Sequence, residues 1–451
     1  MQATAAQPPQ PVDLVIAGGI VVTMDARHTV YNPGAVAVRG NAIATVGPRD
    51  QVAAAYRAAR TLDASNALVM PGLVNGHTHL PMTMFRGLAD DLPLDTWLQQ
   101  YIWPSEREFL SPDHVRWGTL LGAAEMLRGG VTTFCDMYFF EDDVAAAAHA
   151  AGLRGIVAQG FLDFPTPQGL DVEQNVAYAE QLIARWQGNS RIIPALAPHA
   201  LYTVSPPLLK RLHALAVQHD VPLVIHLAET RNEGQQIAAK YGASPVRALA
   251  TLGLLDQRLI AAHCVWVDAE EQALLAQGRV GVIHCPRSNL KLADGVAPVP
   301  DMLAAGVRLG LGTDGAASNN QINLFAEADA AALIHKAVRL DPLAVPAAAA
   351  VEMATIGGAR ALGLDHLIGS LEPGKRADVI LLDLDEDNLV PLYNPLSHLA
   401  YAARSADVRT VLVDGQVVLE DRRLLSLDEA EVRHQVRALA ADIAARQRAH
   451  P

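Results

Sequence analysis

The chain is poor in cysteine, in aromatic residues and in charge. Of its 451 residues, three are cysteines, 5% are aromatic and 18% are charged. Cys135, Cys264 and Cys285 each lie in an apolar run, and none belongs to a CxxC pair. The sequence therefore predicts neither a disulfide framework nor a thiolate zinc knuckle, and it favours a reducing compartment.

Positive charge is scarce as well. With 35 Lys and Arg against 48 Asp and Glu, the net charge is −13. Phosphate backbones and anionic membrane surfaces would repel such a chain, so we expect neither nucleic acid nor a membrane as a partner. No apolar run reaches the roughly 18 residues that a membrane helix requires, and the opening segment lacks the basic and apolar regions of a signal peptide. We therefore expect a cytoplasmic protein.

Apolar residues make up 51% of the chain, which provides for a large core and excludes a disordered or collagen-like protein. Beyond Pro71, short apolar runs alternate with Ala- and Leu-rich helical stretches. The eight runs span 69–74, 131–136, 154–160, 191–197, 222–227, 258–263, 280–284 and 307–313. Buried parallel strands have this continuous apolar character, so the pattern predicts an α/β fold, a (β/α)8 TIM barrel, over residues 69–369.

Both ends of the chain are β-rich. Strand-like segments occur at 13–24, 35–47, 377–384 and 408–419, and a charged amphipathic helix is expected over 427–447. We expect 13–68 and 370–451 to form one composite β-sandwich domain with a C-terminal helix. Residues 1–12 are expected to be a disordered N-terminus.

Histidine and aspartate recur where the predicted barrel strands end. His77 and His79 are two residues apart on an extended segment, so their side chains can converge, although an isolated HxH is more often structural. His226 closes the fifth run, His263 closes the sixth, and Asp314 follows the eighth. Active sites of these barrels lie at the carboxyl ends of the strands, so we expect the five side chains to form one site.

Six motifs carry a family resemblance: PGLVNGHTHLPM, HLAET, AHCVW, HCPRSNLKLADG, LGTDGAASNN and LEPGKRADVILLD. They resemble the amidohydrolase superfamily, and more narrowly the 5′-methylthioadenosine and S-adenosylhomocysteine deaminases of its chlorohydrolase-type group. The likeness extends from about residue 13 to 420. It implies an amidohydrolase-type barrel and a metal-dependent aminohydrolase.

The resemblance further implies that His77, His79, His226 and Asp314 bind one divalent metal. Zinc is the family expectation, with Fe²⁺ and Mn²⁺ as alternatives. Three nitrogens and one carboxylate leave room for a water molecule, as in catalytic zinc sites. Members with two metals use a carboxylated lysine after the fourth strand, and the absence of lysine from 191–201 favours a mononuclear centre.

By the same resemblance, Glu229 is the proton shuttle and His263 orients the attacking water and stabilises charge. Asp314 then has a second role, because it helps to deprotonate that water. Taken without the resemblance, Glu229 would be a solvated loop carboxylate and His263 a buried residue at a strand end.

Substrate contacts are implied for Glu106, which would accept hydrogen bonds from the ribose hydroxyls, for His199 and Glu229, and for Ser318 at the purine. A surface glutamate and a structural loop histidine are the alternatives at Glu106 and His199. The sequence leaves open whether Trp97 and Trp103 cover a purine or pack in the core. Asn289, Lys291 and Gly374 match family motifs, and we interpret them as structural.

One departure from the family concerns the loop after the third strand. Family members that handle S-adenosylhomocysteine can use arginines there, whereas 160–172 contains no Arg or Lys. An uncharged 5′ substituent, as in 5′-methylthioadenosine or adenosine, therefore suits this chain better than a homocysteinyl group.

The sequence accordingly predicts zinc-dependent hydrolytic deamination of an adenosine-type nucleoside to the inosine-type product and ammonia. Deamination or dechlorination of another heterocycle, whether guanine-type, pyrimidine or triazine, is the alternative on the same site. An inactive amidohydrolase-fold scaffold is a remote alternative, because the whole ligand set is present. The sequence leaves a homo-oligomer open.

Overall fold

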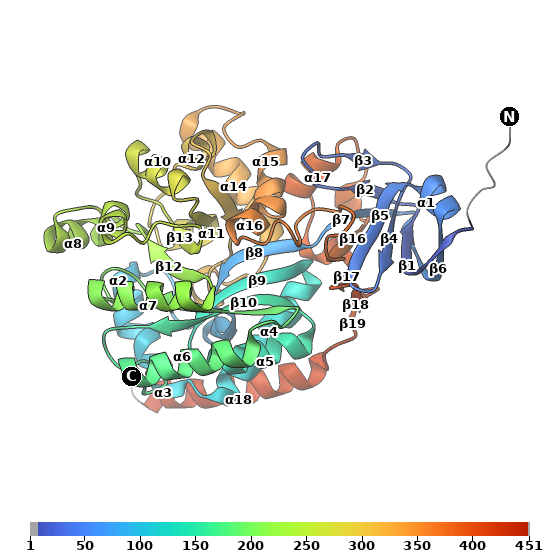
Figure 1. Ribbon diagram of the computed structural model, residues 1–451. Coiled ribbons are helices and arrows are strands. Elements are labelled where there is room, and N and C mark those ends of the chain that lie inside the picture. The colour runs from blue at the N-terminus through green and yellow to red at the C-terminus, as the bar shows by residue number, and fades with distance from the viewer. Residues whose placement is uncertain (1–7, 450–451) are drawn as a thin grey trace.

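The computed structural model describes residues 8–449, which form a helix-covered barrel beside a smaller all-β region (Figure 1). Of the segment expected to be disordered, residues 1–7 lie outside the described part. The expectation is wrong for residues 10–12, because β1 (Gln10–Ala17) begins there and pairs in parallel with β6 (Tyr56–Asp63).

The barrel contains eight strands that are hydrogen-bonded in chain order, and all of their ladders are parallel. They are β8 (Leu73–Thr78), β9 (Val131–Tyr138), β10 (Arg154–Phe161), β11 (Ile192–Pro198), β12 (Leu223–Leu227), β13 (Leu259–His263), β14 (Gly281–His284) and β15 (Arg308–Leu311). The last strand closes on the first: the Asp314 backbone N–H donates to the His77 carbonyl at 3.0 Å. The predicted fold class is confirmed.

Helices connect successive strands and cover the outside of the barrel. The longer ones are α4 (Pro112–Arg128), α5 (Glu141–Ala151), α6 (Val172–Trp186), α7 (Pro206–His219), α8 (Arg231–Tyr241), α9 (Pro245–Leu252), α10 (Ala269–Gln277) and α14 (Leu324–Arg339). Local sequence fixes several starts; Asp171 and Asp268, for example, each form a capping box with the residue three positions later. Between β8 and α4, the chain adds the irregular helix η2 (Trp97–Ile102) and α3 (Trp103–Phe109).

The first predicted run, 69–74, is divided between two sheets. Its beginning lies in β7 (Ala67–Pro71), which pairs with the all-β region, and its end lies in β8. The break is Gly72, where an added Cβ would lie 2.1 Å from Oγ1 of Thr132. Because apolar residues continue on both sides of this glycine, hydrophobicity alone does not reveal the change of sheet.

The all-β region combines segments from both ends of the chain, as expected. One sheet has the order β5 (Ala42–Pro48), β4 (Gly34–Arg39), β1, β6, and the other has the order β19 (Arg423–Leu424), β18 (Gln416–Glu420), β17 (Val408–Val413), β16 (Val379–Asp383), β7, β2 (Ile20–Val22), β3 (Val30–Tyr31). The exact division of the chain into domains at 69 and 370 stays a prediction.

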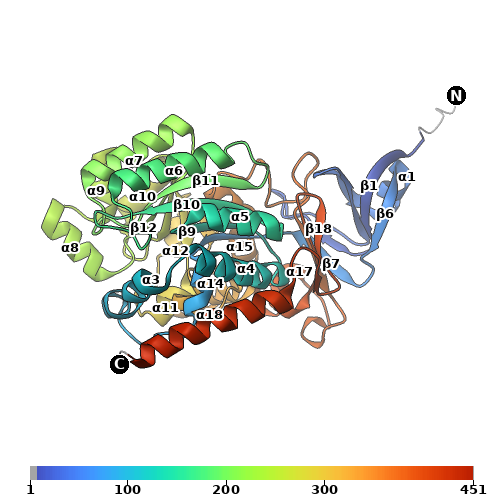
Figure 2. The same cartoon turned by 90° about the horizontal axis from the view of Figure 1, so that it is seen from below.

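The C-terminal helix, α18 (Glu429–Ala449), runs along α4 on the outside of the barrel (Figure 2). Arg128 of α4 holds its first turn, because the guanidinium donates to both carboxylate oxygens of Glu429 at 2.7 Å. None of the helices within residues 8–449 combines the length and the apolar character needed to cross a membrane.

Candidate metal and catalytic site

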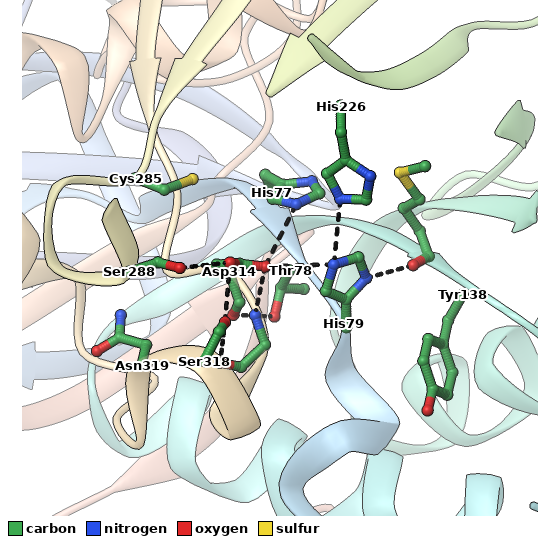
Figure 3. Close-up of polar contacts among 12 residues, drawn as sticks. His77, Thr78, His79, Tyr138, His226, Cys285, Ser288, Asp314, Ser318 and Asn319 are labelled. Carbon is green, nitrogen blue, oxygen red and sulfur yellow. Dashed lines mark hydrogen bonds and ion pairs between the residues drawn. The ribbon is translucent and has the colours of Figure 1, made fainter. Parts of the chain in front are cut away.

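Side chains from β8, β12 and the segment after β15 converge at the carboxyl end of the barrel (Figure 3). Nε2 of His79 lies 3.3 Å from Nε2 of His226 and 3.2 Å from Oδ1 of Asp314. Nε2 of His77 lies 3.5 Å from the same carboxylate oxygen. The structure thus brings together the four residues expected to hold a metal.

The hydrogen bonds of these imidazoles prepare them as ligands. Nδ1 of His226 contacts the His199 carbonyl at 3.0 Å, and Nδ1 of His79 contacts the Met137 carbonyl. A carbonyl partner requires a proton on Nδ1, which leaves the Nε2 lone pair directed at the cluster. His77 is fully buried and neither of its ring nitrogens has a hydrogen-bond partner.

A divalent cation fits this donor set. The buried imidazole of His77 lacks a partner that an ion would supply, and ligand atoms of His77, His79 and His226 lie within 4.8 Å of one another. Three imidazole nitrogens and one carboxylate are the ligand types of a catalytic zinc site with an open position.

Asp314 is held as an ionised carboxylate. Its Oδ2 accepts hydrogen bonds from the hydroxyls of Ser288 and Ser318 at 2.6 and 2.8 Å. Burial acts to raise the pKa of Asp314, but the neighbouring imidazoles of His77 and His79 outweigh burial and hold this pKa well below its usual range. Ser318, expected at the purine, therefore has a structural bond to Asp314 while it also lines the cavity.

His263 ends β13 and faces Glu229, with 3.6 Å between Nε2 and Oε1. Its Nδ1 lies 3.0 Å from Nδ2 of Asn289, the residue interpreted from sequence as structural. Burial lowers the pKa of His263 to about 3, so the ring is neutral. An amide N–H donated to Nδ1 leaves the ring proton on Nε2, facing the carboxyl group.

Glu229 lies in the turn after β12, and Glu233 of α8 fixes that turn. The Glu233 carboxylate accepts the backbone N–H groups of Ala228 and Glu229 at 3.1 and 2.7 Å. Burial first, and then the charges of Asp294 and Asp314, raises the pKa of Glu229 well above its ordinary value. Sequence reasoning missed Glu233, although the N-cap pattern from Thr230 to Glu233 could have indicated it.

Glu106 of α3 is only 2% exposed and faces the same cavity. Its Oε1 accepts a hydrogen bond from the Tyr138 hydroxyl at 2.7 Å. Burial raises the pKa of Glu106 to about 7, against the opposing effect of this bond. Tyr138 was also missed from the sequence, because it ends the apolar run of β9 and there resembles a core residue.

His199 follows β11, with Nδ1 3.0 Å from Oγ1 of Thr203. Its ring meets the His226 ring edge to face at 4.8 Å, and burial lowers the pKa of His199 to about 3. Because its carbonyl also binds His226, His199 supports the metal ligands as well as the cavity wall.

These groups surround a cavity whose empty space, counted together with its mouth to the solvent, is about 700 Å³. Its polar lining includes His79, Glu106, His199, His226, Glu229, His263, Asp314 and Ser318. Trp97 and Trp103 line it too, and the Trp97 indole N–H donates to the Ala89 carbonyl at 3.1 Å. The remaining wall is largely apolar, which suits a flat heterocycle.

Comparison with known proteins identifies relatives over nearly the whole chain. Residues 68–418 match the model of the amidohydrolase family. A 5-methylthioadenosine/S-adenosylhomocysteine deaminase from Syntrophobacter fumaroxidans is 51% identical over 431 residues, which are 96% of this chain and 98% of that protein. A second 5-methylthioadenosine/S-adenosylhomocysteine deaminase, from Nitratidesulfovibrio vulgaris, is 48% identical over 428 residues. These are 95% of this chain and 97% of that protein.

Solved structures give the same picture. An adenosine deaminase from Xanthomonas campestris with bound zinc has a TM-score of 0.95 and 42% identity, covering 97% of this chain and all of its own. An atrazine chlorohydrolase from Arthrobacter aurescens complexed with zinc has a TM-score of 0.88 and 27% identity, covering 95% of this chain and all of its own. The zinc-bound relatives and the histidine cluster support a metal-dependent site.

Proposed function

The chain belongs to the amidohydrolase family and is a metal-dependent hydrolytic deaminase, and on that premise we propose that it deaminates adenosine-type nucleosides with zinc as its metal. The substrates would be 5′-methylthioadenosine and adenosine, and the products the inosine-type nucleoside and ammonia. The observation that carries this proposal is Glu106, a buried carboxyl group that faces the cavity.

In this proposal, His77, His79, His226 and Asp314 hold the metal. A divalent ion in that position lowers the pKa of a water molecule toward about 7 and so supplies a nucleophile at neutral pH. The carbonyl partners of His79 and His226 keep the Nε2 lone pairs available for the ion.

The other polar groups move protons and stabilise charge. Asp314, whose pKa is low, accepts the proton that the attacking water loses. Glu229, whose pKa burial raises well above its ordinary value, delivers its proton to N1 of the purine. It then takes up the proton of the hydroxyl group added at C6 and passes it to the departing amine, so that C6 becomes a carbonyl carbon. The proton that Asp314 accepted is released to solvent, from which Glu229 is protonated again. The Nε2 proton of His263 donates to the oxygen that adds to C6 and stabilises the charge there.

The ribose is the group that Glu106 recognises. The Tyr138 hydroxyl occupies one lone pair of Oε1, which leaves Oε2 and the other lone pair of Oε1 for the 2′ and 3′ hydroxyls. A free base or a triazine has no diol to offer. Glu106 therefore favours a nucleoside over the heterocycles that are the alternative substrates of this site.

Steady-state rates with adenosine, 5′-methylthioadenosine and guanine test the proposal. We expect both nucleosides to be deaminated with a kcat/KM far above that of guanine. Turnover of guanine or of a triazine without turnover of either nucleoside would overturn the proposal and favour the alternative.

Replacing Glu106 tests the ribose contact itself. Glu106→Ala should lower kcat/KM for adenosine by about two to four decades, because each charge-assisted bond is worth roughly 1.5–3 kcal/mol. Glu108→Ala, an exposed change on the same helix, is the matched control and should have little effect. Equal rates for adenosine and 2′-deoxyadenosine, with no effect of Glu106→Ala, would contradict the proposed contact.

A further inference from the structure

A buried carboxyl group of α14 joins two segments beside the metal ligand Asp314. Glu327, in the first turn of that helix, is fully buried. Its Oε1 accepts a hydrogen bond from the side-chain amide of Asn319 at 2.7 Å, and its Oε2 accepts the backbone N–H of Arg287 at 3.1 Å. Charged side chains are almost never fully buried unless they are paired, and these bonds are the pairing that Glu327 has.

The two segments that Glu327 binds carry the hydroxyl groups that bind Asp314. Arg287 is followed by Ser288 in α11 (Pro286–Lys291), and Asn319 is preceded by Ser318 in α13 (Ala316–Asn319). Figure 3 shows the two serines on the side of the Asp314 carboxylate that lies away from His79. Each partner of Glu327 is therefore the chain neighbour of a serine that donates to Oδ2 of Asp314.

The two oxygens of Asp314 have different partners. The serine hydroxyls occupy both lone pairs of Oδ2. Oδ1 accepts the Gly315 backbone N–H at 2.8 Å, and it faces Nε2 of His77 and of His79 at 3.5 and 3.2 Å. Oδ1 thus has a lone pair left, and it is the oxygen directed at the place where the ion would bind.

Asn319 also holds the peptide group that precedes Asp314. Its Nδ2 donates to the Thr313 carbonyl at 2.6 Å as well as to Glu327, so both of its amide hydrogens have fixed partners. Asp314 itself has a φ of +60°, in the left-handed region that residues other than glycine seldom adopt. The bond to Thr313 stabilises this conformation, and with it the direction of the carboxylate.

We propose that Glu327 is a positioning residue for the metal site. It binds the segments that contain Ser288 and Ser318, these serines hold Oδ2 of Asp314, and Oδ1 stays directed at the ion. Glu327 therefore acts through Asp314. This inference rests on the proposed function, because it takes Asp314 as a metal ligand.

Glutamine cannot replace Glu327 without the loss of a bond. Asn319 and Arg287 both approach the carboxyl group with N–H donors, so an amide in either orientation places its NH₂ group against one of them. One of the two segments is then released. Burial raises the pKa of Glu327 to about 8 while its hydrogen bonds act to lower it, so the comparison is made at pH 9, where the carboxyl group is ionised.

The test measures the zinc dissociation constant of the full-length protein by competition with a chelator. Glu327→Gln should raise this constant about 10- to 100-fold, the usual effect of losing a residue that orients a metal ligand. In a Ser288→Ala/Ser318→Ala background the same change should raise it by less than about threefold, because the hydroxyls through which Glu327 acts are already absent. A purely structural role would give the same effect in both backgrounds.

Glu271→Gln is the matched control. Glu271 is also a buried carboxyl group, and it accepts the Ser244 hydroxyl and the Asp268 backbone N–H on the outside of the barrel. Its replacement should lower the free energy of unfolding and leave the zinc dissociation constant unchanged. Asn319→Ala, measured in parallel, breaks the link to Thr313 and should weaken zinc binding as Glu327→Gln does, so the proposal is tested even if Glu327→Gln does not fold.

A zinc dissociation constant that neither Glu327→Gln nor Asn319→Ala changes would overturn the proposal. An equal effect of Glu327→Gln with and without the serine hydroxyls, or an equal effect of Glu271→Gln, would also overturn it. A wild-type protein that binds zinc but deaminates no adenosine-type nucleoside overturns the proposed function and leaves this inference in place. A wild-type protein that binds no zinc overturns both.

Discussion

The acidic residues of the site differ in which form their surroundings favour. Asp314 is held ionised by the imidazoles of His77 and His79, whereas burial favours the protonated form of Glu229. Carboxyl groups with pKa values displaced in opposite directions can act as base and acid in one reaction at one pH. The environment of each group thus supports the separate proton-transfer roles that we propose.

Glu229→Gln should reduce kcat by about 10²–10⁴ and leave bound metal unchanged, because the amide cannot transfer a proton but Glu229 is not among the proposed ligands. Rate measurements and metal analysis of the same preparation check this. The matched control is Glu108→Gln, which removes an exposed carboxylate from α3. An unchanged kcat with a raised KM would make Glu229 a binding residue and would contradict the mechanism.

Titration of Glu106 should make KM depend on pH for substrates that carry the ribose hydroxyls. Its pKa is about 7, so it is ionised above pH 7 and accepts both hydroxyls, and below pH 7 it gains a proton and loses an acceptor position. KM for adenosine should therefore rise as the pH falls through about 7. The Tyr138 bond lowers this pKa, so Tyr138→Phe should move the midpoint to higher pH.

The control substrate for this experiment is 2′,3′-dideoxyadenosine, which lacks both hydroxyls. Other groups that titrate near neutral pH affect both nucleosides equally, so the ratio of the two KM values isolates Glu106. A ratio that does not change between pH 6 and 8, or a midpoint that Tyr138→Phe leaves in place, would show that Glu106 does not recognise the ribose.

Among the elements, the carboxyl ends of the strands bring the metal ligands together. Close packing of β15 against β8 is one requirement: an added Cβ at Gly312 would lie 2.9 Å from the backbone nitrogen and oxygen of His77 and 2.7 Å from Ile283. Only a residue without a side chain allows the segment that carries Asp314 to approach this closely.

Gly312→Ala should therefore lower the free energy of unfolding by about 1–3 kcal/mol and weaken metal retention, since the clash displaces His77 or Asp314. Denaturant titration and metal analysis after dialysis measure both effects. Gly234→Ala on α8 is the control, because no atom lies within 4 Å of the added Cβ, and it should be neutral or slightly stabilising. Full stability and full metal in Gly312→Ala would contradict the packing argument.

The strand ends were predictable from sequence, and several partner residues were not. The apolar runs indicate where each barrel strand ends, and active sites of these barrels lie at those ends. Because the order of residues along the chain is enough to apply this rule, it located His226, His263 and Asp314. Tyr138 acts through a contact with Glu106, a residue distant in sequence, and its own surroundings in sequence are those of a core strand. Such residues become visible only when β9 and α3 are placed side by side.

At the scale of the whole molecule, a buried ion-pair group joins the barrel to the all-β region. Arg154, at the start of β10, is 1% exposed, and its guanidinium lies 3.1 Å from an oxygen of Asp378 and 3.3 Å from one of Asp414. Both aspartates flank strands of the seven-stranded sheet. Since the metal ligands lie at the opposite ends of the barrel strands, this group fixes the two regions together without entering the site.

The proposed reaction depends on one metal ion bound by four strand-end residues. Stepwise addition of Zn²⁺ to chelator-treated protein, with 5′-methylthioadenosine deamination followed at each step, tests this most directly. We expect negligible activity without metal, a linear rise in activity with added zinc, and a plateau at about one zinc per chain. Full activity in the metal-free protein, or a plateau at two zinc ions per chain, would contradict the single-metal site.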